Sequence, residues 1–146
     1  MGFIHKLRRS KKGQQFVEMV IVLPVVLFCL AVVITAGQLV YGKIVSQMAA
    51  YEGARLAVVM DSPGAAKSSA DARASELLEN GIALTKNKTV FKYTGNSWTK
   101  GNFLTFEVHG NVRTLMPMIY KSDQGTYEIR RNTPVVGRIV MRIERS

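Results

Sequence analysis

One stretch of this chain limits what it can fold into more than any other: from Met19 to Gly42 there is no charged side chain. About 20 apolar residues, each rising 1.5 Å along a helix, cover the hydrocarbon core of a bilayer. The stretch is therefore predicted to be a membrane-spanning helix. A single carboxylate, Glu18, stands at its head. An ionisable residue at the edge of such a span is costly to bury, which indicates a functional role.

The positive charge of the chain is concentrated in front of this stretch. The formal net charge is +10, and residues 1–13 supply half of it, with Lys6, Arg8, Arg9, Lys11 and Lys12 and no acid. Basic residues beside an apolar span remain on the cytoplasmic side. We therefore expect the N-terminus inside and the C-terminal part outside the membrane. In the rest of the chain basic and acidic residues alternate, which indicates a solvated surface and no nucleic-acid site.

The pattern predicts one long helix over residues 15–60. Its first half is apolar all round, and Pro24 lies inside it, which membrane helices tolerate. Beyond Gly42 one face carries Ile44, Met48, Tyr51, Arg55 and Val58. The other face consists of small residues, which let a second helix approach closely: Ala49, Ala50, Gly53, Ala54 and Ala57.

A second helix is predicted over residues 63–80, with Pro63 in its first turn and Asn80 near its C-cap. Residues 89–94, 103–112, 126–130 and 135–143 have the alternation typical of strands. In the clearest of them Leu104, Phe106 and Val108 share one side. Pro117 predicts a loop or a sheet edge at that point. Trp98 is interpreted as a lid on the small core.

These elements predict an α+β fold. A long N-terminal transmembrane and stalk helix and a short second helix would carry a small antiparallel sheet of about four strands packed on the long helix. We expect four segments: a basic leader (1–13), the transmembrane helix (14–42), its continuation as a stalk (43–60), and an exported α+β domain (61–146).

Two stretches carry a resemblance to a known family. The first is Lys11-Lys12-Gly13-Gln14-Gln15-Phe16-Val17-Glu18, followed by the apolar helix with its proline, and the second is the small-residue stretch 48–57, which contains Glu-Gly-Ala-Arg. Together they resemble the type IV pilin superfamily, and within it the TadE-like minor pilins, or pseudopilins, of Flp/Tad systems. Met19 stands where major Flp pilins usually have tyrosine, and the chain is longer than those pilins, so a minor component is favoured.

The resemblance implies that a membrane prepilin peptidase cuts between Gly13 and Gln14. Glycine has no side chain, so an extended segment can enter a narrow cleft there. The cut removes five positive charges and leaves a new α-amine on Gln14. Glu18 lies four residues further on and can face that amine or a neighbouring subunit's amine. Such a pair would set the axial register in which the chain assembles with other pilins of the same system. Before assembly the helix would lie among the lipids of the cytoplasmic membrane.

Two alternatives remain open. The first is a bitopic, membrane-anchored binding module that is neither processed nor assembled. The second is a secreted domain, released by a signal peptidase after Ala36, because Ile34-Thr35-Ala36 loosely fits a small-residue cleavage site. The N-terminal residue of the mature chain separates all three hypotheses.

Other candidate residues favour structural roles. Glu52 and Arg55 are spaced for an i, i+3 ion pair on the helix surface. Cys29, the one cysteine, lies in the apolar run and is interpreted as a small apolar residue. His5 and His109 are isolated, so no metal site is expected. The basic residues near the C-terminus indicate a solvated sheet face or an interface with an acidic partner subunit. No catalytic motif or cofactor motif occurs, and we expect no enzyme activity.

Overall fold

The computed structural model of the chain describes residues 11–81, 84–95, 97–121 and 125–144. It contains two helices, α2 (Lys11–Ala57) and α3 (Pro63–Glu79), followed by three strands, β1 (Leu84–Tyr93), β2 (Phe103–Lys121) and β3 (Tyr127–Arg142). Most of the expected leader, residues 1–10, lies outside the described residues. The predicted α+β class, with a long first helix and a short second one, is confirmed.

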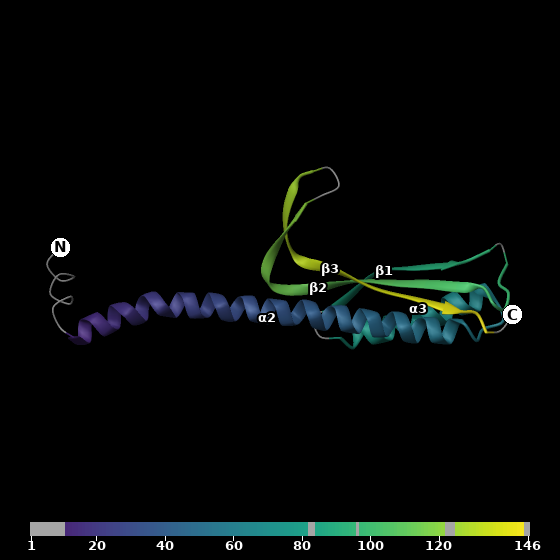
Figure 1. The fold of residues 1–146 in the computed structure, drawn as a ribbon, viewed down its shortest axis with the longest axis horizontal. Coiled ribbons are helices and arrows are strands. Elements are labelled where there is room, and N and C mark those ends of the chain that lie inside the picture. Colours follow the sequence, from purple (N-terminus) through teal and green to yellow (C-terminus); the bar gives the residue numbers. More distant parts are fainter. Residues whose placement is uncertain (1–10, 82–83, 96, 122–124, 145–146) are drawn as a thin grey trace.

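The long helix α2 is about 70 Å long, at 1.5 Å for each of its 47 residues. Its N-terminal half extends away from the rest of the chain, whereas its C-terminal half is packed against α3 and the sheet (Figure 1). Pro24 lies inside α2 and does not end it. The helix is thus one continuous element with two different surroundings.

The short helix α3 begins where the sequence predicts. Ser62 is its N-cap, and the Ser62 hydroxyl accepts a hydrogen bond from the Ala65 backbone N–H at 3.3 Å. Asn80 is the C-cap, and its backbone N–H donates to the Glu76 carbonyl at 3.2 Å. Every fourth residue along one side of α3 is buried, and these residues are Ala66, Ala70, Ala74 and Leu78. This narrow alanine face lets α3 lie close against α2.

The sheet is antiparallel, with the order β1-β2-β3. Its inner face covers the C-terminal half of α2, with β2 in the centre (Figure 1). The predicted inward side of β2 is confirmed, because Leu104, Phe106 and Val108 are fully buried. Phe106 is the largest fully buried side chain of the described part of the chain. The core is therefore built between this strand and the small residues of the two helices.

The sheet has three strands and not the four that we expected. The predicted strands at 126–130 and 135–143 are parts of one strand, β3, which continues through Pro134. Proline lacks an N–H donor, and an edge strand such as β3 tolerates it. The expected loop at Pro117 is likewise inside β2, within an irregularity between Arg113 and Met118 where residues 114–117 have no ladder partner.

Trp98 closes one end of the core, as predicted. The Trp98 indole is nine per cent exposed and stacks on Phe91, with 5.8 Å between ring centroids. Its Nε1–H donates to the Met60 carbonyl at 3.0 Å, just beyond the end of α2. Near the C-terminus, the Glu144 backbone N–H donates to the Val58 carbonyl at 3.0 Å. Both contacts fix the end of α2 to the sheet.

The closest approach of α2 to the sheet occurs at Ser46. A Cβ added to Gly137 of β3 would overlap the Ser46 backbone carbonyl, and a Cβ added to Gly110 of β2 would lie 3.4 Å from the Ser46 hydroxyl. Backbone atoms cannot move aside as the end of a flexible side chain can. Strand β3 therefore needs glycine at Gly137, where the helix crosses it, whereas a Cβ at Gly110 would make ordinary van der Waals contact.

We predict that Gly137→Ala destabilises the domain strongly, because its new methyl group meets backbone. The expected loss is about 2–3 kcal/mol in the free energy of unfolding, the upper part of the range for overpacked cores. Denaturant unfolding of the full chain in detergent, followed by the fluorescence of Trp98, measures it. Gly64→Ala in α3 is the matched control, since a Cβ there meets nothing within 4 Å. Equal stability of the two variants would contradict this account.

Candidate functional site

The residues predicted to direct processing and assembly lie in the first two turns of α2. Gly13 and Gln14 are both helical. The Gln14 side-chain amide donates a hydrogen bond to a carboxylate oxygen of Glu18 at 3.3 Å. Gln14 and Glu18 thus lie on one face of the helix, one turn apart, and both are exposed. The carboxylate at the head of the apolar run is accessible to another molecule.

The apolar half of α2 is exposed on all sides within this chain. Nearly every residue from Phe16 to Ile34 is exposed, including Pro24 and Cys29. The helix is long and apolar enough to cross a membrane. Such a surface is stable only in contact with lipid or with other apolar helices. This half of α2 is therefore suited to be a single-pass membrane anchor.

The small-residue face of α2 is occupied by the chain's own domain. Gly42, Ala49, Ala50, Gly53, Ala54 and Ala57 are all buried. A Cβ on Gly53 would lie 2.6 Å from Phe106 Cε1 and 3.0 Å from the Ala70 carbonyl oxygen, so both the sheet and α3 meet α2 there. The helix that approaches these residues closely is thus α3. Any further helix would have to contact α2 on a different side.

That other side carries an exposed row of larger side chains, which we call the outer stripe: Ile44, Met48, Tyr51 and Arg55. A groove of about 410 Å³ runs beside it, lined by Gln47, Met48, Tyr51, Glu52 and Ile139. The outer stripe continues the exposed apolar surface of the anchor along the same helix. It is an exposed part of the domain-bound half of α2 that a partner can reach.

Glu52 and Arg55 do not form the expected ion pair in the described part of the chain. Arg73 of α3 instead pairs with Glu76, with 2.8 Å between Nη1 and Oε2. The hydrogen bond and the charge of Glu76 raise the pKa of the Arg73 guanidinium, and Glu52 adds a smaller increase. The Glu52 carboxylate thus interacts electrostatically with Arg73 of α3, whereas Arg55 is exposed on the outer stripe.

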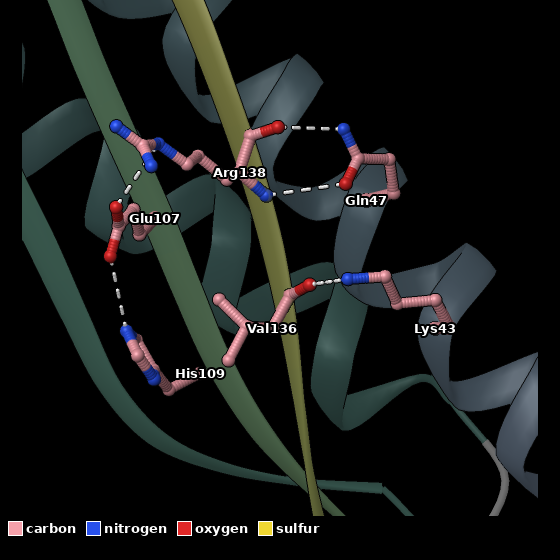
Figure 2. A network of polar contacts seen from close by, with 6 residues as sticks. All are labelled: Lys43, Gln47, Glu107, His109, Val136 and Arg138. Atoms are coloured by element: carbon pink, nitrogen blue, oxygen red, sulfur yellow. Dashed lines mark hydrogen bonds and ion pairs between the residues drawn. The ribbon is translucent and has the colours of Figure 1, made fainter.

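Side chains of α2 cover the open edge of β3 (Figure 2). The Gln47 amide donates to the Arg138 carbonyl at 2.8 Å, and its oxygen accepts from the Arg138 backbone N–H at 3.2 Å. One glutamine thus pairs with the strand as a neighbouring strand would. The Lys43 ammonium donates to the Val136 carbonyl, one step along the same edge. These contacts block the edge against pairing with another strand.

The outer face of the sheet carries a small charged network (Figure 2). Glu107 lies 3.3 Å from Arg138 Nε and 3.5 Å from His109 Nε2. The predicted structural role of His109 agrees with this position beside a cross-strand ion pair. Among the described residues no three His, Cys, Asp or Glu side chains lie close enough to hold a metal ion.

Sequence reasoning missed the contacts between α2 and β3. Lys43 and Gln47 are ordinary polar residues in the sequence, and only their position over a strand edge gives them a role. Gly137 did provide a signal, since an isolated glycine within a strand pattern often marks a close backbone approach.

Comparison with known families agrees with this geometry. Residues 13–55 match the family model described as TadE-like protein. The match begins at Gly13, ends at Arg55 and lies entirely within α2. No curated protein and no solved structure matches the chain. The chain is thus similar to TadE-like proteins over residues 13–55, which make up nearly all of its long helix.

Proposed function

We propose that this chain is a minor pilin, or pseudopilin, that takes part in the assembly of a Tad-type pilus or a related secretion filament. The observation that carries the proposal is the structure of α2. Its N-terminal half is apolar and exposed on all sides, with Glu18 alone at its head, whereas its C-terminal half is fixed to a folded domain. The role is structural, without catalysis or a cofactor. The domain would lie outside the cytoplasmic membrane and the basic leader inside it.

Processing between Gly13 and Gln14 fits the weakness of the first turn of α2. This turn contains no acidic residue, which would stabilise the positive end of the helix dipole. Glycine is also a poor helix former. Both features favour local unwinding, and a prepilin peptidase would need this segment in an extended form. The remainder of α2 would stay helical in the membrane.

Glu18 would act after the cut. The Gln14–Glu18 contact shows that residue 14 and the carboxylate share one helix face. A new α-amine on Gln14 would place a positive charge at the same end of the helix. In a bundle of apolar helices an unpaired carboxylate is costly, so pairing with an amine on a neighbouring pilin would favour one axial offset. The outer stripe would then contact the same neighbours further along α2.

We predict that Gly13→Ala blocks processing. In a native host, the wild-type chain should begin at Gln14, and its intact mass should lack the first thirteen residues. The variant should keep its leader, because the methyl group no longer fits an extended substrate cleft. Gly37→Ala is the control, since a Cβ there meets nothing within 4 Å in the folded chain. A wild-type chain that keeps its leader would support a simple membrane anchor, and one that begins at Gly37 would support a secreted domain.

We also predict that Glu18→Ala leaves the chain in the membrane but prevents its assembly. The measured quantity is the amount of the chain recovered in complexes with other pilins after mild crosslinking of whole cells. Glu18→Gln should be recovered in complexes hardly more than Glu18→Ala, because glutamine keeps a hydrogen-bond acceptor but lacks the negative charge. Glu79→Gln, at an exposed position at the end of α3, should assemble normally. Undiminished recovery of the Glu18→Ala chain would rule out the register role of this carboxylate.

A further inference from the structure

The far ends of β2 and β3 form a two-stranded arm that leaves the domain. We call residues 118–121 of β2 and 127–130 of β3 the distal ribbon. They pair beyond the irregularity in β2, and the ribbon turns away from α2 instead of following it (Figure 1). Neither helix covers it (Figure 1).

The two faces of the distal ribbon differ. Ile119 pairs with Ile129, and Lys121 pairs with Tyr127, so these four side chains share one face. Ile119, Tyr127 and Ile129 are about 70 per cent exposed, at 69%, 71% and 72%. The other face is more polar and has its own internal contacts, in which Arg130 pairs with Glu128 and the Tyr120 hydroxyl lies 3.9 Å from Met118 Sδ. The ribbon thus exposes one apolar face with a lysine at its edge.

The base of this arm, at Leu115 and Met116 of β2, is fixed to a defined position along α2. The Leu115 backbone N–H donates to Gln38 Oε1 at 2.9 Å, and the Met116 N–H donates to Thr35 Oγ1 at 3.4 Å. Gln38 lies 20 residues after Glu18, which is about 30 Å of helix and equals the thickness of the hydrocarbon core. If Glu18 marks one boundary of the bilayer, the arm leaves α2 at the other boundary. An arm that turns away from the helix axis there runs along the membrane surface.

Two arginines lie beside the base of the arm. Arg113 and Arg131 line a groove of about 550 Å³ together with Leu84, Thr85 and Asn132. Neither arginine is in an ion pair within the described part of the chain. Leu84 packs against Gly42 of α2, four residues or about 6 Å beyond Gln38. The lipid headgroup layer is about 5–8 Å thick, so the groove lies at the depth of the phosphates.

We propose that this side of the domain binds the membrane leaflet from which α2 emerges. The apolar face of the distal ribbon lies against the acyl-chain boundary, and Arg113 and Arg131 bind the phosphates of anionic phospholipids in the groove. Guanidinium groups match phosphate oxygens in a bidentate geometry, and Lys121 adds charge at the same surface. The inference rests on the membrane placement of α2 in the proposed function. It adds a second contact, which would hold the domain in one orientation on the membrane before assembly.

Lipid fits this surface better than a protein partner does. The apolar side chains and the unpaired arginines lie at the two depths where a bilayer offers acyl chains and phosphates. Because α2 fixes the depth of the apolar side chains and of the arginines, no further element is needed to place them against the bilayer. A second copy of the chain would have to bring an acidic surface, and acids are scarce, since the chain has 10 acidic and 20 basic residues.

The test uses nitroxide labels on the full chain in lipid nanodiscs, in a Cys29→Ala background. Single cysteines replace Ile119 in the ribbon, Val25 in the anchor and Lys67 on the exposed side of α3. Power saturation compares collisions of each label with oxygen, which concentrates in lipid, and with a water-soluble nickel chelate. We expect a several-fold higher ratio of oxygen to nickel collisions at 119 than at 67, and the highest ratio at 25.

The arginines are tested by lipid composition. Replacing part of the phosphatidylcholine by phosphatidylglycerol should raise the ratio at 119, and the double variant Arg113→Gln/Arg131→Gln should lose this rise. Arg138→Gln, in the network with Glu107, is the matched control and should keep it.

Three results would overturn the proposal. A label at 119 as exposed to water as the one at 67, with 25 in lipid, would refute the ribbon contact and leave the anchor standing. Water exposure at 25 as well would refute the anchor itself. A label at 119 shielded from both reagents, and broadened only when two chains share a disc, would identify a second copy as the occupant.

Discussion

The structure depends on how closely α2 lies to the sheet. At Ser46 the helix backbone meets Gly137 so directly that no side chain fits between them. The fully buried residues of α2 from this point to its end are all small, and α3 adds an alanine face of its own. Small groups bury little area each, but they let Phe106 and its neighbours pack tightly against helix backbone. The same helix therefore serves as the anchor and as the central support of the domain.

Because the sheet is attached to α2, the position of this helix in the membrane determines the position of the domain. Gln47 and Lys43 hold the edge of β3, and Gln38 and Thr35 hold β2, so the sheet is fixed to α2 along several turns. In the proposed assembly, any axial offset that Glu18 sets between neighbouring helices would displace the attached domains by the same distance. Because the small-residue face is already filled, subunits in the proposed assembly would meet through the outer stripe and through the exposed apolar half of α2.

Local patterns predicted much of the fold. The start of α3 at Pro63, its C-cap at Asn80 and the inward side of β2 follow from propensity and periodicity, which act over a few residues. The strand count was wrong at Pro134, and the loop or sheet edge expected at Pro117 is instead a part of β2. Proline usually interrupts strands, but here one lies in an irregularity and the other in an edge strand, and both depend on pairing with distant residues. The same holds for Gln47 and for the two arginines of the groove, whose roles arise only from what the folded chain brings beside them.

The central claim is that one continuous helix has two independent supports, lipid for residues 19–34 and the domain for residues 42–57. Hydrogen exchange of the α2 amides, measured on the full chain in nanodiscs with and without Phe106→Ala, tests it most directly. Losing this buried ring costs about 3–5 kcal/mol in a typical core. The account predicts much faster exchange at 42–57 in the variant and unchanged, slow exchange at 19–34. Equal acceleration along the whole helix, or no change at 42–57, would contradict it.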